Sequence, residues 1–306
     1  MEIIELVARR QELLKELEGL VYGTVEIRQK GELNYLYVHF REKGIKQTRY
    51  VGVYSQELHN LVLANSARAK AIKKEIRQLE KKLKESGFIE TDLSPAVQKN
   101  IDFAKRQLVD TIYKQAVLEG IATTYANTET IIEGGKVQNM TAEDVLKVLN
   151  LKHAWEFILN ENVVQSFSNF AILCEINKLV LEGIYYNAGQ VRSIPVSIGG
   201  TNWKPSLPIE SDLKDHLSKI LSQNITVIDK AIELLLFVMK KQIFIDGNKR
   251  TAVVFANHFL VQNAGGLIVI PDNQIEQYKN LLIAYYEGKD EKSIKTFLKK
   301  YAHQKL

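Results

Sequence analysis

Apolar residues recur at intervals of three or four positions along most of the chain, a spacing that predicts a mainly helical protein. The period changes between residues 21 and 53, where Val, Ile, Tyr and Thr are enriched and two Lys-Gly pairs provide turn signals. This stretch predicts a three-stranded antiparallel meander, with strands at residues 21–28, 34–41 and 46–53. An amphipathic helix is expected before it, over residues 2–17.

Helical spacing returns over residues 56–85, and this segment is strongly basic. Residues 65–85 carry eight Lys and Arg against three Glu, an excess of five that equals the formal net charge of the chain, +5. Ser86-Gly87 breaks the pattern and Ser94-Pro95 starts the next element. We therefore predict a small α+β region over residues 1–90 and a separate helical domain over residues 91–306.

The predicted meander also combines rings with cations. Stacking rings next to phosphate-binding side chains are the usual combination in proteins that bind single-stranded nucleic acid. A small sheet with a solvated basic face and a helical arm with a solvated charged face are the alternatives. The residues concerned are Arg28, Tyr35, Tyr37, Arg41, Lys46, Arg49 and Tyr50.

The rest of the chain predicts a helical bundle with one interruption. Helices are expected over residues 97–121, 142–159, 167–182, 225–241 and 251–263, followed by two closing helices. Between them, residues 188–205 alternate Val and Ile with polar residues around Gly199 and Gly200, which predicts a short hairpin. An exposed strand edge and a structural loop that packs Trp203 on the core are two compatible interpretations of this segment.

The segment from Gln242 to Arg250 carries the clearest chemical signal. It reads Gln-Ile-Phe-Ile-Asp-Gly-Asn-Lys-Arg and separates two predicted helices. Gly247 allows a left-handed turn, and the free amides at the start of the second helix suit an anion such as phosphate. Asp246 is a hard oxygen ligand of the kind that Mg²⁺ takes beside substrate phosphates. The segment therefore predicts a magnesium–nucleotide loop.

This segment resembles the signature of the Fic family, His-x-Phe-x-Asp/Glu-Gly-Asn-Gly/Lys-Arg, with Phe244 and residues 246–250 in register. Fic enzymes typically transfer AMP from ATP to a protein hydroxyl, and the related Doc toxins phosphorylate a protein instead. The resemblance implies a Fic-like fold and ATP and Mg²⁺ as cofactors. It also implies roles for Asp246 on the metal, for Asn248 and the loop amides of Gly247 and Lys249 on phosphate, and for Arg250 on the outer phosphates.

Two positions depart from the family pattern. Gln242 stands where the family has its catalytic histidine, and Val253 stands where many members have a second arginine. A neutral amide cannot take the proton from an attacking hydroxyl, as a histidine can. The sequence thus predicts a catalytically weakened or inactive relative, and it does not say whether Gln242 is natural or introduced.

Two further segments resemble parts of Fic proteins. Residues 120–134 resemble the inhibitory segment that blocks the nucleotide site, with Glu133 as the obstructing glutamate; a helix end capped by Gly134 is the alternative. Residues 188–205 resemble the flap that holds the target as an added strand, with Ile198, Gly199, Gly200 and Thr201 at its tip. Any ion pair of Glu133 must use Arg250 or Lys249, because Val253 replaces the usual partner.

Composition limits the remaining choices. Apolar residues make up 45% and charged residues 25% of the 306 positions, as in ordinary globular proteins. No apolar run approaches the length of a membrane span, and the N-terminus does not resemble a secretory signal, so we expect a cytoplasmic protein. The expected partners are a nucleotide, an unidentified protein target and, through the basic N-terminal region, nucleic acid. The oligomeric state stays open, a homo-oligomer included.

Three functions follow from these observations. The first is a Fic-type nucleotidyltransferase or its weakened descendant. The second is a nucleic-acid-binding or partner-binding protein in which the Fic-like body is a scaffold. The third is a Doc-like kinase, favoured by Lys249 and by the missing second arginine.

Overall fold

The computed structural model describes residues 3–42, 45–86 and 93–306. The chain divides into two compact units, Met1–Ile89 and Glu90–Leu306. The boundary predicted near residue 90 lies outside the described residues. Within the described ranges, no helix is both long and apolar enough to cross a membrane.

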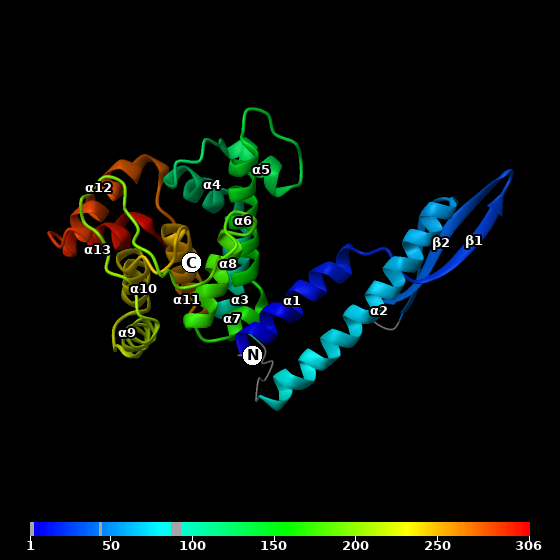
Figure 1. Cartoon of the computed structure of the whole chain (residues 1–306), viewed down its shortest axis with the longest axis horizontal. Coiled ribbons are helices and arrows are strands. Elements are labelled where there is room, and N and C mark those ends of the chain that lie inside the picture. Colours follow the sequence, from blue (N-terminus) through cyan, green and yellow to red (C-terminus); the bar gives the residue numbers. More distant parts are fainter. Residues whose placement is uncertain (1–2, 43–44, 87–92) are drawn as a thin grey trace. The chain divides into compact units, whose positions relative to one another are not determined.

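The N-terminal unit contains the predicted meander between two helices. Its elements are α1 (Ile3–Gly19), β1 (Thr24–Lys30), β2 (Leu33–Glu42), β3 (Ile45–Val53) and α2 (Gln56–Glu85) (Figure 1). The strands pair antiparallel in the order β1-β2-β3, and Leu36 and Val38 of β2 are buried with Val62 of α2. Ser55 caps α2, because its side chain accepts a hydrogen bond from the Leu58 N–H. The meander and the basic helix are thus confirmed.

The second unit is a helical bundle built around one buried hairpin of helices. The hairpin pairs α10 (Val227–Lys241) with α11 (Asn248–Gln262), and every residue from Arg250 to Val261 is buried. A helix that is buried on all sides lies at the centre of a bundle. The surrounding helices are α3 (Pro95–Arg106), α4 (Leu108–Leu118), α5 (Tyr125–Ile132), α6 (Ala142–Ile158), α7 (Glu161–Gln165), α8 (Phe170–Val180), α9 (Glu210–Ser222), α12 (Ile275–Tyr286) and α13 (Lys292–Phe297).

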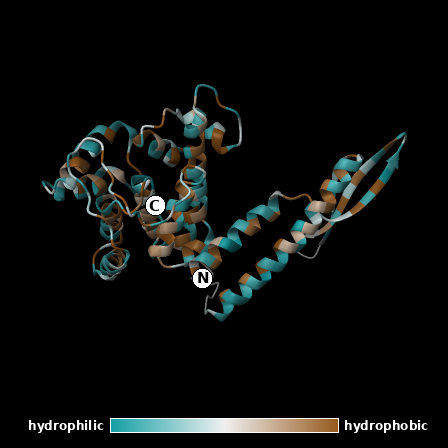
Figure 2. Ribbon diagram, in the orientation of Figure 1, coloured by the Kyte–Doolittle hydropathy of each residue, from teal (hydrophilic) through white to brown (hydrophobic). Residues whose placement is uncertain are grey.

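The hydropathy of α2 agrees with its burial. Figure 2 shows α2 mostly in the hydrophilic colours, in keeping with one narrow buried seam that runs from Val62 to Leu83. A second, two-stranded sheet pairs β4 (Leu267–Ile268) with β5 (His303–Gln304) after the central hairpin. The mainly helical fold with a small N-terminal sheet agrees with the prediction.

Three details differ from the sequence-based expectation. The helix predicted over residues 97–121 is two helices, α3 and α4, joined at Gln107. The hairpin predicted for residues 188–205 is wrong, since this segment contains no strand. Its proline residues remove backbone donors, and buried Arg192 binds the carbonyls of Ile194 and Ser206 instead of a partner strand. Helix α9 was not predicted.

Candidate active site

The site begins where α10 ends in a left-handed turn. Gln242 caps α10 with φ of 45°, and its side-chain Nε2 donates to the Met239 carbonyl at 2.6 Å. The Arg192 guanidinium donates to the Gln242 carbonyl at 2.5 Å, and the Arg192 N–H donates to the Ile243 carbonyl at 3.0 Å. The residues that follow α10 are therefore held by α10 itself, through the Gln242 side chain, and by Arg192.

Asn248 closes the loop on itself. Its Oδ1 accepts from the Phe244 N–H at 2.9 Å, and its Nδ2 donates to the Phe244 carbonyl at 2.8 Å. Phe244 is fully buried, so these bonds satisfy a backbone that water cannot reach. The Asn248 side chain is therefore used to hold the loop, which leaves its backbone N–H, at the start of α11, for an anion.

Asn177 of α8 holds the other side of the loop. It is fully buried, and its Nδ2 donates to the Asp246 carbonyl and to the Thr251 hydroxyl, both at 3.1 Å. Its Oδ1 accepts from the Gly189 N–H at 2.9 Å. Gly247 has φ of 72°, and a Cβ there would lie 3.3 Å from Asn177 Nδ2. Only glycine accepts both the conformation and the close approach without strain.

Charged groups gather at the start of α11. Arg250 is only 4% exposed, and its Nη2 lies 3.1 Å from the Asp246 carboxylate, which is 46% exposed. The Arg250 Nε and Nη1 atoms have no hydrogen-bond partner among the described residues. The Glu119 carboxylate, at the C-cap of α4, lies 3.8 Å from Nε and also pairs with Lys249 at 3.4 Å.

Glu119, Asp246 and Lys249 line a hollow of about 450 Å³. Its walls are the loop and the start of α11, the end of α4 at Glu119, the flap over residues 196–200, and α12. The α12 side chains in the wall are Tyr278, Lys279, Leu282, Ile283 and Tyr286. Burial raises the pKa of both tyrosine phenols well above the usual range, so neither supplies a base at neutral pH.

The flap is anchored to α12 and the residue after it through two residues that follow Gly200. Thr201 donates to Glu287 at 2.8 Å, and the Trp203 ring stacks on Tyr286 with centroids 5.5 Å apart and planes 4° apart. Trp203 thus packs on the core, as one of the two interpretations expected. The flap segment lies over the hollow without forming a strand.

The structure brings most of the predicted site residues together. Gln242, Asp246, Gly247, Asn248 and Lys249 line the hollow, and so do Ile198, Gly199 and Gly200. Arg250 joins them through Asp246. Thr201, which was predicted together with them, is not among the lining residues of the hollow.

Glu133 lies elsewhere. It is exposed at the end of α5 and forms no ion pair with any residue in the described ranges. The acid that reaches Arg250 and Lys249 is Glu119, at the end of the preceding helix. Sequence reasoning missed Glu119 because its spacing from the loop depends on how α4 packs.

No histidine lines the hollow in the part of the chain that the structure describes. His258 is fully buried, and its ring nitrogens are bonded to the Ser168 hydroxyl at 2.8 Å and the Val163 carbonyl at 3.0 Å. Burial lowers its pKa to about 4. The tertiary structure therefore does not replace the histidine that is absent at position 242.

Three supporting residues escaped the sequence analysis besides Glu119: Asn177, Arg192 and Gln115. Gln115 donates to the Arg250 carbonyl at 2.9 Å and accepts from the Trp155 indole at 3.0 Å. Asn177 is a polar residue within the largely apolar run of α8, which is the one signal that the sequence offered, whereas Arg192 and Gln115 have polar neighbours and gave none. Buried polar groups in such places are usually bonded to the backbone of another element.

The fold and the site define a class of helical protein in which a short loop, closed by Asn248 and lined with charged side chains, joins two core helices. The model of the Fic/DOC family matches residues 167–260. This match spans α8, the flap, the central hairpin of helices and the loop. Residues 167–260 therefore carry a Fic/DOC family domain.

Solved structures share the fold over a larger part of the chain. Fic-1 (residues 134–508) from C. elegans is 18% identical, with a TM-score of 0.55 over 78% of this chain and 72% of that one. A Fic family protein from Desulfovibrio desulfuricans G20 is 16% identical, with a TM-score of 0.53 over 68% and 72%. A Fic domain containing signaling protein from Bacteroides thetaiotaomicron is 22% identical, with a TM-score of 0.50 over 67% and 80%. No curated protein sequence matches the chain.

Proposed function

We propose that the hollow binds ATP together with Mg²⁺ and supports a slow transfer of AMP to a protein hydroxyl. The observation that carries this proposal is the cluster at the start of α11. A buried arginine with two unused donors lies 3.1 Å from an accessible carboxylate, beside the free amides of a 15-residue helix. An anion that carries a bound cation would pair with the Arg250 guanidinium, and its cation would pair with the Asp246 carboxylate.

The residues present fit a magnesium ion. Asp246 is half exposed and lines the hollow, so it can offer an oxygen while phosphate oxygens and water complete the shell. When bound, the ion neutralises phosphate charge and orients the leaving group. Asp246 is the residue of this chain that would hold it.

The transfer itself needs a proton acceptor. A target hydroxyl oxygen forms a bond to the α-phosphorus, the bond from that phosphorus to the bridging oxygen breaks, and pyrophosphate leaves with the electron pair. The hydroxyl proton must go to a base, and Gln242 cannot accept it. Because a general base contributes about 10²- to 10⁴-fold, the expected rate is lower than that of a histidine-containing Fic protein by a similar factor.

Glu119 would oppose nucleotide binding. Its carboxylate lines the hollow, is only 13% exposed, and lies 3.4 Å from Lys249 and 3.8 Å from Arg250. Phosphate and carboxylate compete for the same cations, so nucleotide must displace Glu119 before it can reach Arg250. The obstructing role assigned from the sequence to Glu133 would then belong to Glu119.

The flap would hold the target protein. Residues 196–200 line the hollow opposite the loop, and their backbone is not paired in a sheet. An extended target segment could add to this backbone as a strand and bring its hydroxyl to the hollow. The target itself must be found by labelling.

Calorimetric titration of the full chain with ATP, with and without MgCl₂, tests the binding step. We expect binding that requires Mg²⁺ and that Asp246→Ala and Arg250→Ala each abolish. Labelling with ATP marked on the α-phosphate tests the transfer, and Gln242→His should raise it about 10²- to 10⁴-fold. Absence of binding under all conditions would sink the proposal, whereas binding without transfer in Gln242→His would leave only a nucleotide-binding role.

Label on the γ-phosphate distinguishes the second candidate. Lys249 lines the hollow, and position 253 has a buried valine where many AMP-transferring Fic proteins have a second arginine. Both features favour a Doc-like kinase. Transfer of γ-label to a protein, without α-label, would assign kinase activity instead.

A further inference from the structure

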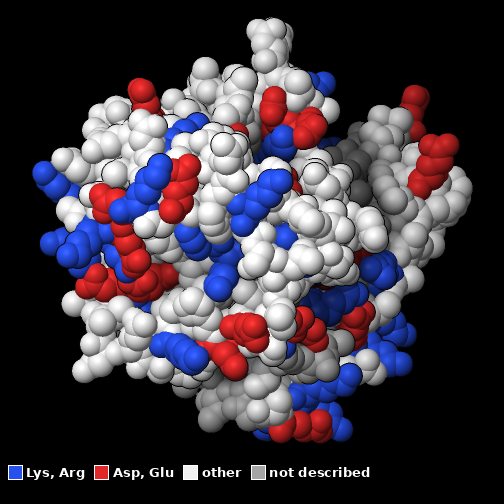
Figure 3. Space-filling view, turned by 60° about the vertical axis from the view of Figure 1, so that its left-hand side comes forward, with Lys and Arg blue, Asp and Glu red and all other residues white. Residues whose placement is uncertain are grey.

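The net charge of the chain comes from its N-terminal unit alone. Residues 1–89 contain 17 Lys and Arg against 12 Asp and Glu, whereas residues 90–306 contain 24 of each. Figure 3 shows both signs interspersed on the face of the molecule that it presents. A local excess of one sign attracts a partner of the opposite sign and raises its rate of association.

Within the N-terminal unit, the excess follows one face of α2. Lys70, Lys74, Arg77, Lys81 and Lys84 recur every three or four residues, and all are exposed. We call this set, together with Lys73, the basic stripe. From Lys70 to Lys84 it is about 21 Å long at the rise of an α-helix. The buried seam of α2 lies on a different face, so the stripe is not needed for packing.

The basic stripe is also little neutralised. Off the stripe, α2 is tied to α1 by Arg68 with Glu16 at 2.6 Å and by Glu75 with Arg9 at 2.9 Å. On the stripe, Lys81 lies 3.8 Å from Glu85, and the other stripe residues form no ion pair with any described residue. The fold therefore uses its acids elsewhere and leaves these cations available.

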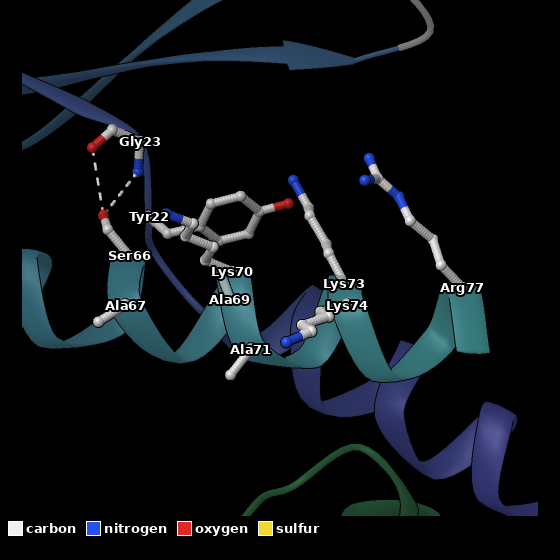
Figure 4. A pocket seen from close by; sticks show the side chains of 10 residues that line it. All are labelled: Tyr22, Gly23, Ser66, Ala67, Ala69, Lys70, Ala71, Lys73, Lys74 and Arg77. Carbon is white, nitrogen blue, oxygen red and sulfur yellow. Dashed lines mark hydrogen bonds between the residues drawn. The ribbon is translucent and has the colours of Figure 1, made fainter. Parts of the chain in front are cut away.

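A hollow of about 730 Å³ adjoins the stripe (Figure 4). Its lining includes Lys70, Lys73, Lys74 and Arg77, with small residues and Tyr22 between them, and it contains no acid. Figure 4 shows Lys73 and Arg77 extending from α2 on the side where the Tyr22 ring lies, and Lys73 Nζ is 4.5 Å from the centre of that ring. Ser66 fixes the backbone here through two bonds to Gly23.

The outer face of the sheet is a weaker candidate for the same partner. Tyr37 and Tyr50 lie there with centroids 5.5 Å apart, as the nucleic-acid hypothesis requires. Arg28, however, pairs with Glu26 at 2.8 Å, and Glu26 also bonds His39 at 2.6 Å. This network neutralises the cation next to the rings and places a carboxylate, with its pKa lowered to about 2 by Arg28 and His39, on the face.

We propose that the basic stripe and the Tyr22 hollow bind a single strand of nucleic acid. Regularly spaced cations suit a phosphate backbone, and a ring recessed among cations suits an unpaired base. A duplex presents its phosphates on a broad convex surface with its bases stacked inside, so its bases cannot reach a recessed ring. The proposal is independent of the nucleotide site.

Fluorescence anisotropy of the full chain with a labelled oligo(dT) or oligo(U) of about 20 nucleotides tests the proposal. The stripe variant is Lys70→Ala, Lys74→Ala, Arg77→Ala, and alanine keeps the helix propensity. We expect at least a tenfold loss of affinity, and a plot of log affinity against log salt that is shallower by about 2, since each phosphate contact on a single strand contributes about 0.7. Tyr22→Leu should weaken binding roughly fivefold or more at unchanged salt dependence.

The matched control removes the same charge from the second unit through three exposed lysines, Lys99→Ala, Lys105→Ala and Lys219→Ala. It should bind the oligonucleotide like the unmodified chain. The proposal is overturned if the unmodified chain does not bind at low salt, or if the control loses as much affinity as the stripe variant. Equal or tighter binding of a duplex, or of vesicles containing anionic lipid, also overturns it.

Discussion

At the scale of single residues, Glu119 and Gln242 decide what the site can do. In the proposed transfer, Gln242 stands where the base is expected and cannot act as one, while Glu119 places a negative charge beside Lys249 and Arg250, the two cations that phosphate would need. The Glu119 Oε1 is buried and has no hydrogen-bond partner among the described residues, so this oxygen is held by the ion pair with Lys249. A carboxylate held only by ion pairs can be displaced by a stronger anion.

We predict that Glu119→Gln binds ATP with Mg²⁺ about tenfold more tightly, equivalent to about 1.4 kcal/mol. The reason is that the substitution keeps the shape and removes the charge that competes with phosphate. Calorimetric titration measures the change directly.

Glu133→Gln is the control for this prediction, because Glu133 is exposed and forms no ion pair with any described residue. Its affinity should stay that of the unmodified chain. Tighter binding in Glu133→Gln, with no change in Glu119→Gln, would return the obstructing role to Glu133.

At the scale of elements, the loop depends on a helix that carries no site residue. Asn177 of α8 bonds the loop at Asp246, the start of α11 at Thr251 and the flap side at Gly189. One buried amide thus joins three segments that each contribute to the hollow. Loss of such a group leaves several buried partners unsatisfied.

We predict that Asn177→Ala lowers the free energy of unfolding by roughly 2–4 kcal/mol. It should also weaken ATP binding at temperatures where the variant is fully folded, because the loop loses its support. Urea denaturation and calorimetric titration measure the two effects.

Asn100→Ala separates stability from positioning. Asn100 is equally buried and bonds Gly266 through both side-chain atoms, away from the loop. This variant should lose stability without losing affinity for ATP. If both variants lose affinity to the same degree, Asn177 has no special role in the site.

At the scale of the whole molecule, the stability of the second unit should depend on pH through its central helix. Burial disfavours the charged ring and lowers the pKa of His258 from its ordinary value of 6.5 to about 4 in the fold. The unfolded chain therefore binds the proton more readily than the folded chain. Stability is highest above pH 6.5 and falls as the pH drops from 6.5 toward 4.

We predict a loss of about 2 kcal/mol from this residue between pH 7 and pH 5, rising to roughly 3 kcal/mol below pH 4. Urea denaturation of the unmodified chain and of His258→Gln at several pH values measures it. The variant should be less stable at pH 7 but should show a smaller decline with falling pH. Parallel declines in the two proteins would contradict the assignment.

The sequence alone determined the local features of this protein. Helical and strand periods located the meander, α2 and the central helices, because amphipathic spacing follows from backbone geometry. The loop was also visible, since a glycine, an acid and two cations at a helix start are adjacent in the chain. The family resemblance rested on those same adjacent residues.

Only the tertiary structure decided which distant residues complete the site. Glu119, Asn177 and Arg192 reach the loop through the packing of α4, α8 and the flap, and no local pattern encodes such contacts. The flap failed to form a hairpin because side chains and prolines, rather than a second strand, determine its backbone bonds. Likewise, the sequence counted the charges of α2, but the fold showed which of them its acids leave unpaired, because ion pairs depend on how helices pack together.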